Sequence, residues 1–417
     1  MRSRPVFFPS LFVLAILVVL GSLYFVNLRL AANTAIGDDF RLYWSGGRYF
    51  VFQTVNPYRP EPAAQIRRDV FGTPLTSDGY PYRLEYPFYI LLLYLPFSAA
   101  IKNAGVALSL WMLFLQVSLA LTLILHLRVL EWRPRPVSIF LLFLFVFFWQ
   151  YDVIALLDGN VSLILGLLLA GVLFSLRNES DEVAGILLAF STFKWEAGGP
   201  LILFILIWAF SQRRWRFLSF FGITLGILFA ITTILLPSWL QPFLQSVVAN
   251  LRAGKGFSTF SIFHLWWRGL GQKLAWGLTG ILIVTLFLEW RAACRDASWQ
   301  RFAWTSALTL AATPLLGLPV ELANLSLLTF PTLLVLVVSA GRWSRLATWS
   351  IGFWVVGLTL LPWLALFRSN SLEHTTYRLM LLLTTFLLLA LYWLKWWAVR
   401  PPRLWLDRLK AAANTSL

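Results

Sequence analysis

The sequence predicts an all-α protein that crosses a membrane many times, and three observations lead to this fold class. Of its 417 residues, 59% are hydrophobic and only 12% are charged, whereas about a quarter are charged in soluble domains. The mean hydropathy is +0.74. Apolar runs of roughly 17–25 residues recur along the chain, the length that a helix needs to span hydrocarbon with every backbone group paired. We expect one transmembrane domain over residues 1–417, with about 11 to 13 helices.

The excess of basic residues is interpreted as an orientation signal. A formal charge of +16 would indicate a polyanion partner in a soluble chain. Here the basic residues gather in short connections between apolar runs, as the positive-inside rule describes. One threading puts five basic groups on the cytoplasmic side: 128–135, 213–216, 291–296, Arg342 with Arg345, and the tail 400–417. We therefore expect a multi-pass protein of the plasma membrane and no nucleic-acid partner.

The first helix is expected over about Pro9–Leu30, and Arg2 and Arg4 place its start in the cytoplasm. A cleaved signal peptide is the alternative, but the run is longer than a typical signal core and has no convincing cleavage site. A single cysteine, Cys294, excludes an internal disulfide and a cysteine-built metal site. Three scattered histidines do not predict a cluster, so we expect no metal and no cofactor; they are His126, His264 and His374.

Residues 31–85 form the longest polar stretch and are expected to lie outside the cytoplasm. They hold six of the 18 acidic residues: Asp38, Asp39, Glu61, Asp69, Asp78 and Glu85. A loop of this length is uncommon unless it is functional. Its "RLYWSGGRYFVFQ" segment is amphipathic enough to lie as a helix in the membrane interface.

The rest of the chain is threaded through the bilayer by the same rule. The 86–127 stretch holds two apolar runs but crosses once, so its first run is expected as a partial or strongly tilted helix at the outer face. Two short runs, Val183–Phe193 and Gly199–Phe210, are separated by "KWEAGGP" and predict either a helix broken at membrane depth or two short helices that meet beneath a cavity. Residues 237–271 are expected as a second outer segment with an interfacial helix. The remaining runs are about 136–155, 161–176, 217–236, 273–290, 302–318, 322–340, 346–366 and 375–397.

This threading brings unusual polar residues to the outer face. A charge at membrane depth costs a few kcal/mol, so each is a functional candidate. Asp39 is the candidate base, because a carboxylate beside aromatic groups at a membrane rim is suited to accept a proton. The candidates for substrate binding are Asp38, Asp158, Lys194, Glu196, Arg252, Lys255, His264, Arg268, Glu321 and Asn324.

Several of these residues also have a structural interpretation. Asp38 and Asp39 can cap the helix that follows them, and Asp158 fits a turn in "DGN". Lys194 and Glu196 can pair with each other in the broken helix. The remaining alternatives concern the second outer segment: Arg252 and Lys255 can meet anionic head groups, and His264 can sit at the interface beside "LWW".

Five segments, in order, resemble the polytopic GT-C glycosyltransferases of glycosyltransferase family 87. They are "DDFRLYWSGGRYFVFQTVNPYRP", "EYPFYILLLYLPFS", "LLDGNVSLILGLLLAGVLF", "AGILLAFSTFKWEAGGPLILFILIW" and "ATPLLGLPVELANLSLLTFP". The first is similar to the family's outer-loop signature, matched at Asp39, Phe40, Tyr43, Ser45, Gly46 and Asn56-Pro57-Tyr58. The others resemble its Tyr-Pro-Pro, Gly-Gln-x-Asn, Ala-Gly…Lys-Pro and Ser-Pro…His elements. The likeness covers about residues 1–345.

The resemblance implies a GT-C-type bundle, an outward-facing active site and a polyprenyl-phosphate-linked sugar donor, with mannose as the family's sugar. It also implies Asp39 as the catalytic acid/base position and adds Tyr43 to the substrate-binding candidates. Membrane lipids and a glycolipid, polysaccharide or protein acceptor are the other expected partners. The sequence departs from the family at Phe88 and Trp195, where relatives have proline, and it has Glu321 and Asn324 where they carry a histidine.

The function expected is inverting transfer of a hexose, in which Asp39 takes the acceptor proton while Lys194, Arg252, Lys255 or Arg268 stabilises the departing phosphate. A transporter or lipid flippase is the alternative, because transporters also build sites from broken helices and buried charges. They commonly have paired repeats, which this sequence does not show. A third reading is another membrane transferase, such as a polysaccharide ligase or polymerase, with an Arg or His of the second outer segment as its catalyst.

Overall fold

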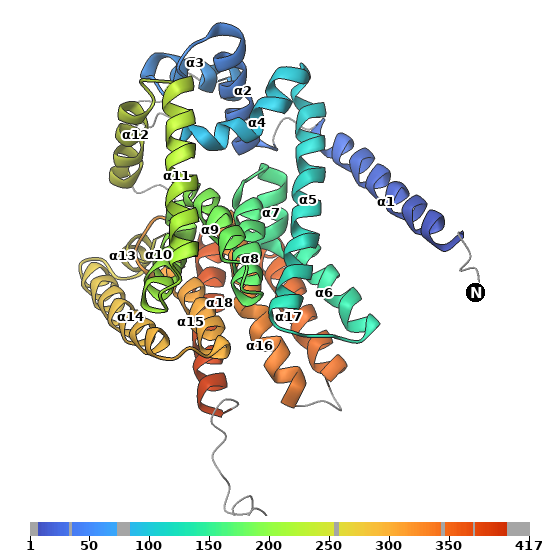
Figure 1. Cartoon of the computed structure of the whole chain (residues 1–417), viewed down its shortest axis with the longest axis vertical. Coiled ribbons are helices and arrows are strands. Elements are labelled where there is room, and N and C mark those ends of the chain that lie inside the picture. Colours follow the sequence, from blue (N-terminus) through green and yellow to red (C-terminus); the bar gives the residue numbers. More distant parts are fainter. Residues whose placement is uncertain are drawn as a thin grey trace, which may run out of the picture.

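A computed structural model describes residues 7–32, 36–72, 84–253, 258–342, 347–369 and 372–397. These residues form eighteen α-helices and three short 3-10 helices, with no strand among them. The chain is therefore an all-α polytopic membrane protein, as the sequence predicts. Figure 1 shows the helices as an elongated bundle, with α2, α3, α4 and α12 gathered at one end.

Seven helical segments in the described residues are long and apolar enough to span a membrane. They are α1 (Phe7–Ala31), α5 (Ala104–Val129), α11 (Trp215–Leu235), α14 (Leu270–Arg295), η3 (Leu322–Leu328) continuing into α16 (Thr329–Arg342), α17 (Ala347–Phe367) and α18 (Leu372–Trp397). A pair bent by 50° adds an eighth if it is counted as one span: α6 (Pro136–Phe148) with α7 (Gln150–Asp158). Three helices are apolar but shorter: α4 (Phe88–Ala100), α8 (Ser162–Arg177) and α10 (Trp195–Ser211). The seven spans, the bent pair and the three shorter helices together give eleven apolar segments in the described residues, which is the lower end of the 11 to 13 helices expected.

The spanning helices divide into those that face lipid and those that form the core. In α1 only 6% of the spanning window is buried, whereas the window over η3 and α16 is 78% buried. The apolar surface of α1 is therefore turned to hydrocarbon rather than to protein. Near its end α1 is held to α5 by a side-chain pair, Asn27 with Gln116, whose amides exchange hydrogen bonds of 2.9 and 3.1 Å. Such polar contacts are a common way to join helices in lipid.

Four connections with basic residues meet at the end of the bundle away from α2. Arg177, which ends α8, pairs with Glu131 and lies over the Trp299 ring. Arg214, just before α11, contacts Asp181 at 3.0 Å. Trp299 and Asp181 begin α15 (Trp299–Ala312) and α9 (Asp181–Phe190). The grouping of basic residues 128–135, 213–216 and 291–296 on one side agrees with the threading.

The first outer loop folds into α2 (Asp38–Gln53) and α3 (Pro60–Phe71), so the amphipathic segment is helical as expected. α4 packs against α2, with Trp44 Nε1 donating to the Phe97 carbonyl at 3.2 Å, so the first run of the 86–127 stretch is a short helix as expected. The second outer segment contains α12 (Leu240–Ala253) and α13 (Thr259–Trp266). Asn56 of the first loop donates to the Ser238 carbonyl at 3.1 Å, so the two outer segments meet over the bundle (Figure 1).

The predicted break between two short apolar runs is found at Lys194. α9 ends at Phe190, a 3-10 turn η1 (Ser191–Phe193) follows, and Lys194 has non-helical dihedrals, φ −122° and ψ 70°. α10 begins directly after it, so the whole "WEAGGP" segment is helical. Lys194 is therefore the one residue of the interruption that is in neither an α-helix nor a 3-10 turn. Because that residue is a fully buried lysine, the break places a cation inside the bundle.

Candidate functional site

The amino end of α2 lies against the carboxyl end of α7. Gly37 takes the left-handed conformation at φ 80° and donates its amide to the Leu157 carbonyl at 2.8 Å. The Asp39 amide then donates to Asp158 Oδ1 at 3.2 Å. Gly37 is the N-cap and no side chain of its own caps the helix. The capping role considered for Asp38 and Asp39 is therefore wrong: a carboxylate from another helix accepts the free amide instead.

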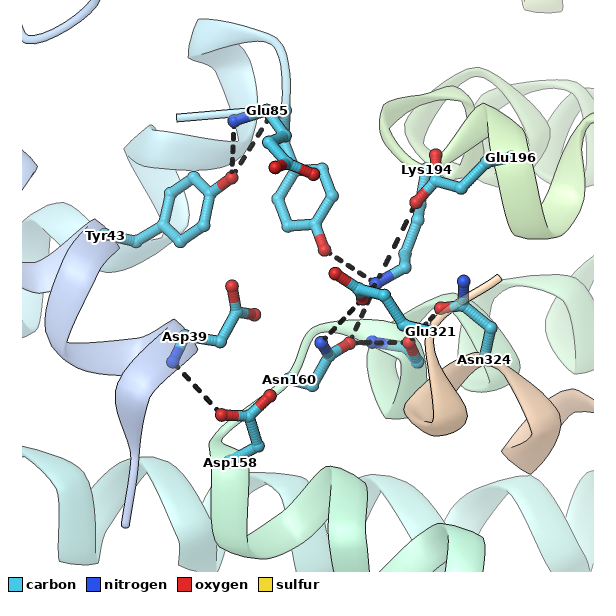
Figure 2. A network of polar contacts seen from close by, with 11 residues as sticks. Asp39, Tyr43, Glu85, Asp158, Asn160, Lys194, Glu196, Glu321 and Asn324 are labelled. Carbon is cyan, nitrogen blue, oxygen red and sulfur yellow. Dashed lines mark hydrogen bonds and ion pairs between the residues drawn. The ribbon is translucent and has the colours of Figure 1, made fainter. Parts of the chain in front are cut away.

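Asp38 and Asp39 face different surroundings although they are adjacent. Asp38 is exposed to solvent. Asp39 has one carboxylate oxygen, Oδ2, that is buried and has no hydrogen-bond partner among the described residues. Figure 2 shows the Asp39 carboxyl pointing into the space between Tyr43, Asp158 and the Lys194 cluster. A buried acceptor without a donor is unusual, so this oxygen is available to a ligand.

Lys194 is the centre of a polar cluster, and its side chain is fully buried. Its Nζ lies 2.6 Å from Tyr86 Oη, 2.9 Å from Asn160 Oδ1 and 2.7 Å from Glu321 Oε2. Glu196, the partner suggested by its place in the sequence, is farther away at 4.0 Å. An ammonium group has three N–H donors, and all three are in use. Glu321 is thus the principal ion partner of Lys194.

A second layer of hydrogen bonds fixes the acceptors of Lys194. Asn160 donates its amide to Glu321 Oε2 at 3.1 Å, and the Ser162 amide donates to Asn160 Oδ1 at 2.9 Å. The Ser162 hydroxyl donates to Asn324 Oδ1 at 2.8 Å. The other end of the Asn324 amide, Nδ2, is buried without a partner among the described residues. The connection between α7 and α8, the start of α8 and the start of η3 are in this way joined around one ammonium (Figure 2).

Tyr43 holds the segment that leads into α4. Its hydroxyl accepts the amides of Glu85 at 2.9 Å and Tyr86 at 3.2 Å. Its ring stacks on Tyr86, with centroids 5.0 Å apart and planes 9° apart, and on Tyr94 at 5.2 Å. Because Tyr86 also contacts Lys194, Tyr43 connects α2 to the Lys194 cluster. Its hydroxyl already has two structural partners.

The electrostatics of the site are dominated by carboxylates. Burial raises the pKa of Asp39 well above its ordinary value, and the carboxylates of Asp158 and Glu321 raise it further, while the Lys194 ammonium acts in the opposite direction. Glu85 adds a smaller effect of the same sign as the other carboxylates. A carboxylate with a raised pKa is a stronger base when it is ionised. In the described part of the chain no three acidic, histidine or cysteine residues are arranged to bind a metal ion.

The structure brings seven of the twelve predicted site residues together. Asp39, Tyr43, Asp158, Lys194, Glu196, Glu321 and Asn324 lie around one space (Figure 2). His264 and Arg268, on α13 and just after it, are exposed and have no recorded contact with this group. The Arg252 side chain and the whole of Lys255 lie outside the described residues. The predicted contribution of Arg252 and Lys255 to the site is therefore not tested.

Four residues of the cluster were not among the sequence candidates: Glu85, Tyr86, Asn160 and Ser162. Tyr86 and Asn160 stand in two of the segments that carry the family resemblance, "EYPFY" and "LLDGNVS". Their position in these segments was a signal that could have identified Tyr86 and Asn160 as site residues. Ser162 had none, because a serine at a helix start is ordinarily explained by capping.

Comparison with known proteins gives one match. The sequence model of glycosyltransferase family 87 matches residues 84–319. This range includes Asp158, Lys194 and Glu196; Asp39 precedes it and Glu321 follows it by two residues. No curated protein and no solved structure shows significant similarity to the chain.

Proposed function

The chain belongs to glycosyltransferase family 87, and from that premise we propose that it moves a hexose from a polyprenyl-phosphate-linked donor to a glycolipid, polysaccharide or protein acceptor outside the cytoplasm. Mannose is the sugar that the family resemblance favours. The observation that carries the proposal is the buried Oδ2 atom of Asp39, which has no partner among the described residues and faces the Lys194 cluster.

In the proposed reaction Asp39 is the general base. Its Oδ2 takes the proton of an acceptor hydroxyl while that oxygen forms a bond to the anomeric carbon of the donor sugar. The bond from this carbon to the phosphate oxygen breaks at the same time, and its electron pair leaves with the lipid phosphate. Attack and departure on opposite faces invert the anomeric centre. A phosphate leaves without being protonated, so no second carboxylic acid is needed, unlike in glycoside hydrolysis.

Asp158 supports this role by fixing the backbone of the base. Its bond to the Asp39 amide, at 3.2 Å, anchors the first turn of α2 on α7. The Asp39 side chain is then oriented by rigid elements rather than by a loop, which catalysis requires of a base that must meet a hydroxyl at hydrogen-bond distance.

Lys194 can reach a donor phosphate only by exchanging one of its three acceptors. Glu321 is the partner that faces open space, because 44% of its side chain is exposed while Lys194 is fully buried. We infer that the phosphate displaces Glu321 from Lys194 when the donor binds. A charge-assisted bond between ammonium and phosphate would compensate for the lost ion pair.

The outward orientation of the site is supported by charge. The basic connections joined through Arg177 and Arg214 lie at the end of the bundle away from α2. By the positive-inside rule that end faces the cytoplasm. Asp39 would then face the opposite side of the plasma membrane, where a polyprenyl tail can remain in the bilayer while its sugar reaches the site.

The test is product formation by the purified protein. Reconstituted protein receives a labelled polyprenyl-phosphate sugar and a detergent extract of acceptor glycolipids. The proposal predicts label in a covalently extended product. Movement of intact labelled lipid between leaflets without any product would identify a flippase and contradict the proposal. Undiminished product after replacement of Asp39, together with loss of product in His264→Ala or Arg268→Ala, would transfer the catalytic role to the second outer segment.

A further inference from the structure

A cavity lies where the end of α1 meets the start of α5, beside the first turns of α2. Its volume is about 670 Å³, and its lining includes two arginines, Arg29 and Arg41. Among the described residues that line it there is no carboxylate. Arg41 follows Asp39 by two residues on α2, which turns the two side chains to opposite sides of the helix. The cavity is therefore separate from the Lys194 cluster.

The Arg41 guanidinium is fixed in place and still has free donors. Its Nε donates to the Ile36 carbonyl at 3.0 Å, and Nη2 contacts the Ala31 carbonyl at 3.5 Å. Arg has five N–H donors, so three have no recorded partner among the described residues. Asp38 interacts with Arg41 through space but is itself exposed to solvent. Arg41 is thus held as a planar donor group at the cavity.

Arg29 provides a second cation on the α1 side. It is exposed, and its guanidinium lies 5.2 Å from the centre of the Phe25 ring. Stacking on an aromatic ring orients a guanidinium without using its N–H groups. Both arginines therefore offer donors to the same space, and a phosphate group is a ligand whose geometry such paired guanidinium groups match.

The start of α5 adds to the positive potential of the two arginines. Asn103 Oδ1 accepts the Val106 amide at 3.1 Å. The two preceding amides, of Ala104 and Gly105, have no partner within the helix, and both residues line the cavity. The amino end of this 26-residue helix therefore carries partial positive charge toward the same space.

The other walls of the cavity are apolar and continuous with the lipid-facing surface. Phe25 and Leu28 line it from α1, the helix whose spanning window is only 6% buried. A ligand here has its anionic group between Arg29 and Arg41 and its chain along α1. We propose that Arg29, Arg41 and the amino end of α5 bind the phosphate of a membrane lipid. This inference goes beyond the proposed function, because it does not depend on sugar transfer.

Two lipids share this chemistry, a polyprenyl phosphate and an anionic phospholipid, and the test separates them. Native mass spectrometry of the full chain in a neutral detergent counts bound lipid after addition of undecaprenyl phosphate in one arm and phosphatidylglycerol in the other. The variants are Arg29→Gln with Arg41→Gln, and Ala32→Phe, which fills the cavity without removing a charge. Arg59→Gln is the control, because Arg59 is exposed at the start of α3.

We expect occupancy of this cavity, counted beyond the one lipid that the proposed donor site at Lys194 holds in the undecaprenyl phosphate arm, to fall at least five-fold in the double variant and in Ala32→Phe. Occupancy should stay unchanged in Arg59→Gln. A fall in one arm alone supports the site and identifies which lipid occupies it. Equal occupancy in wild type, Ala32→Phe and the arginine variants in both arms would overturn the proposal. If the double variant does not fold, lipid binding by Arg29→Gln alone and by Ala32→Phe tests the proposal. Asp39→Asn should bind lipid normally here, so failure of this site and failure of the proposed function are distinguishable.

Discussion

The Lys194 ammonium lies 2.7 Å from Glu321 Oε2, although 127 residues separate the two in the chain. This contact joins the break before α10 to the start of η3 and places a fully buried cation beside a half-exposed anion. Removing Glu321 leaves that cation with two neutral acceptors, Tyr86 and Asn160, and with the Glu196 carboxylate at 4.0 Å. The ion pair therefore holds two distant segments together. It is also the contact that a donor phosphate would break in the proposed function.

Breaking this pair should destabilise the protein measurably. A double-mutant cycle of Lys194→Met and Glu321→Gln should give a coupling of roughly 1–3 kcal/mol in the free energy of unfolding, because the contact is partly buried and charge-assisted. Reversible SDS titration in mixed micelles measures it. The control pair is Arg216 with Glu182, which are 3.7 Å apart and largely exposed; its coupling should be below about 1 kcal/mol. A coupling for Lys194 and Glu321 no larger than that of the control pair would contradict this prediction.

The pH dependence of transfer should report the raised pKa of Asp39. A general base must be deprotonated to act, so kcat/KM should rise with pH as Asp39 loses its proton. The midpoint of this acidic limb of the pH profile should lie above the ordinary aspartate pKa of about 3.9. Asp158→Asn or Glu321→Gln removes a negative charge that raises the pKa of Asp39, so either should move this limb to lower pH.

The matched control for the pH profile is Asp296→Asn, because Asp296 follows α14 at the opposite end of the bundle. Its limb should coincide with that of the wild type. A limb that moves to higher pH in Asp158→Asn or Glu321→Gln would contradict the assignment, since it would require these carboxylates to favour ionisation of the base.

Gly159 sets the distance between α7 and α2, and its replacement should displace Asp39. Its φ is +71°, and an added Cβ would lie 2.6 Å from Phe40 Cβ. Gly159→Ala should cost about 1–2 kcal/mol from the left-handed backbone alone, and the contact with Phe40 should lower turnover as well. Gly226→Ala on α11, where nothing lies within 4 Å, should leave both unchanged or raise stability slightly. Thermal unfolding and product formation measure the two effects; full activity in Gly159→Ala would show that this approach does not position the base.

Local patterns were enough to predict the all-α membrane fold, because each apolar run predicts its helix without reference to the rest of the chain. Run length indicated the interruption near Lys194, and a short run containing proline indicated that Phe88–Ala100 is a separate short helix. Partners across the bundle were different. The sequence offered Glu196 to Lys194 because they are neighbours, whereas the structure selects Glu321, and nothing local distinguishes carboxylates brought together only by packing.

The difference between Asp38 and Asp39 also depends on packing. Both begin α2, and only the docking of Gly37 on Leu157 turns one carboxyl inward and leaves the other in solvent. The Arg29 and Arg41 cavity was not predicted for a related reason. Arginines near a membrane are ordinarily explained by lipid head groups or by orientation, and their convergence on the start of α5 appears only in three dimensions.

The central claim is that Asp39 accepts the proton of the acceptor hydroxyl, and its most direct test is the rate of product formation by Asp39→Asn. This change preserves shape and removes the base, so the rate should fall by about 10²–10⁴-fold while binding of the lipid-linked donor is retained. Asp69→Asn, an exposed carboxylate in the same outer loop, should transfer at the wild-type rate. Turnover of Asp39→Asn within a few-fold of the wild type would contradict the account.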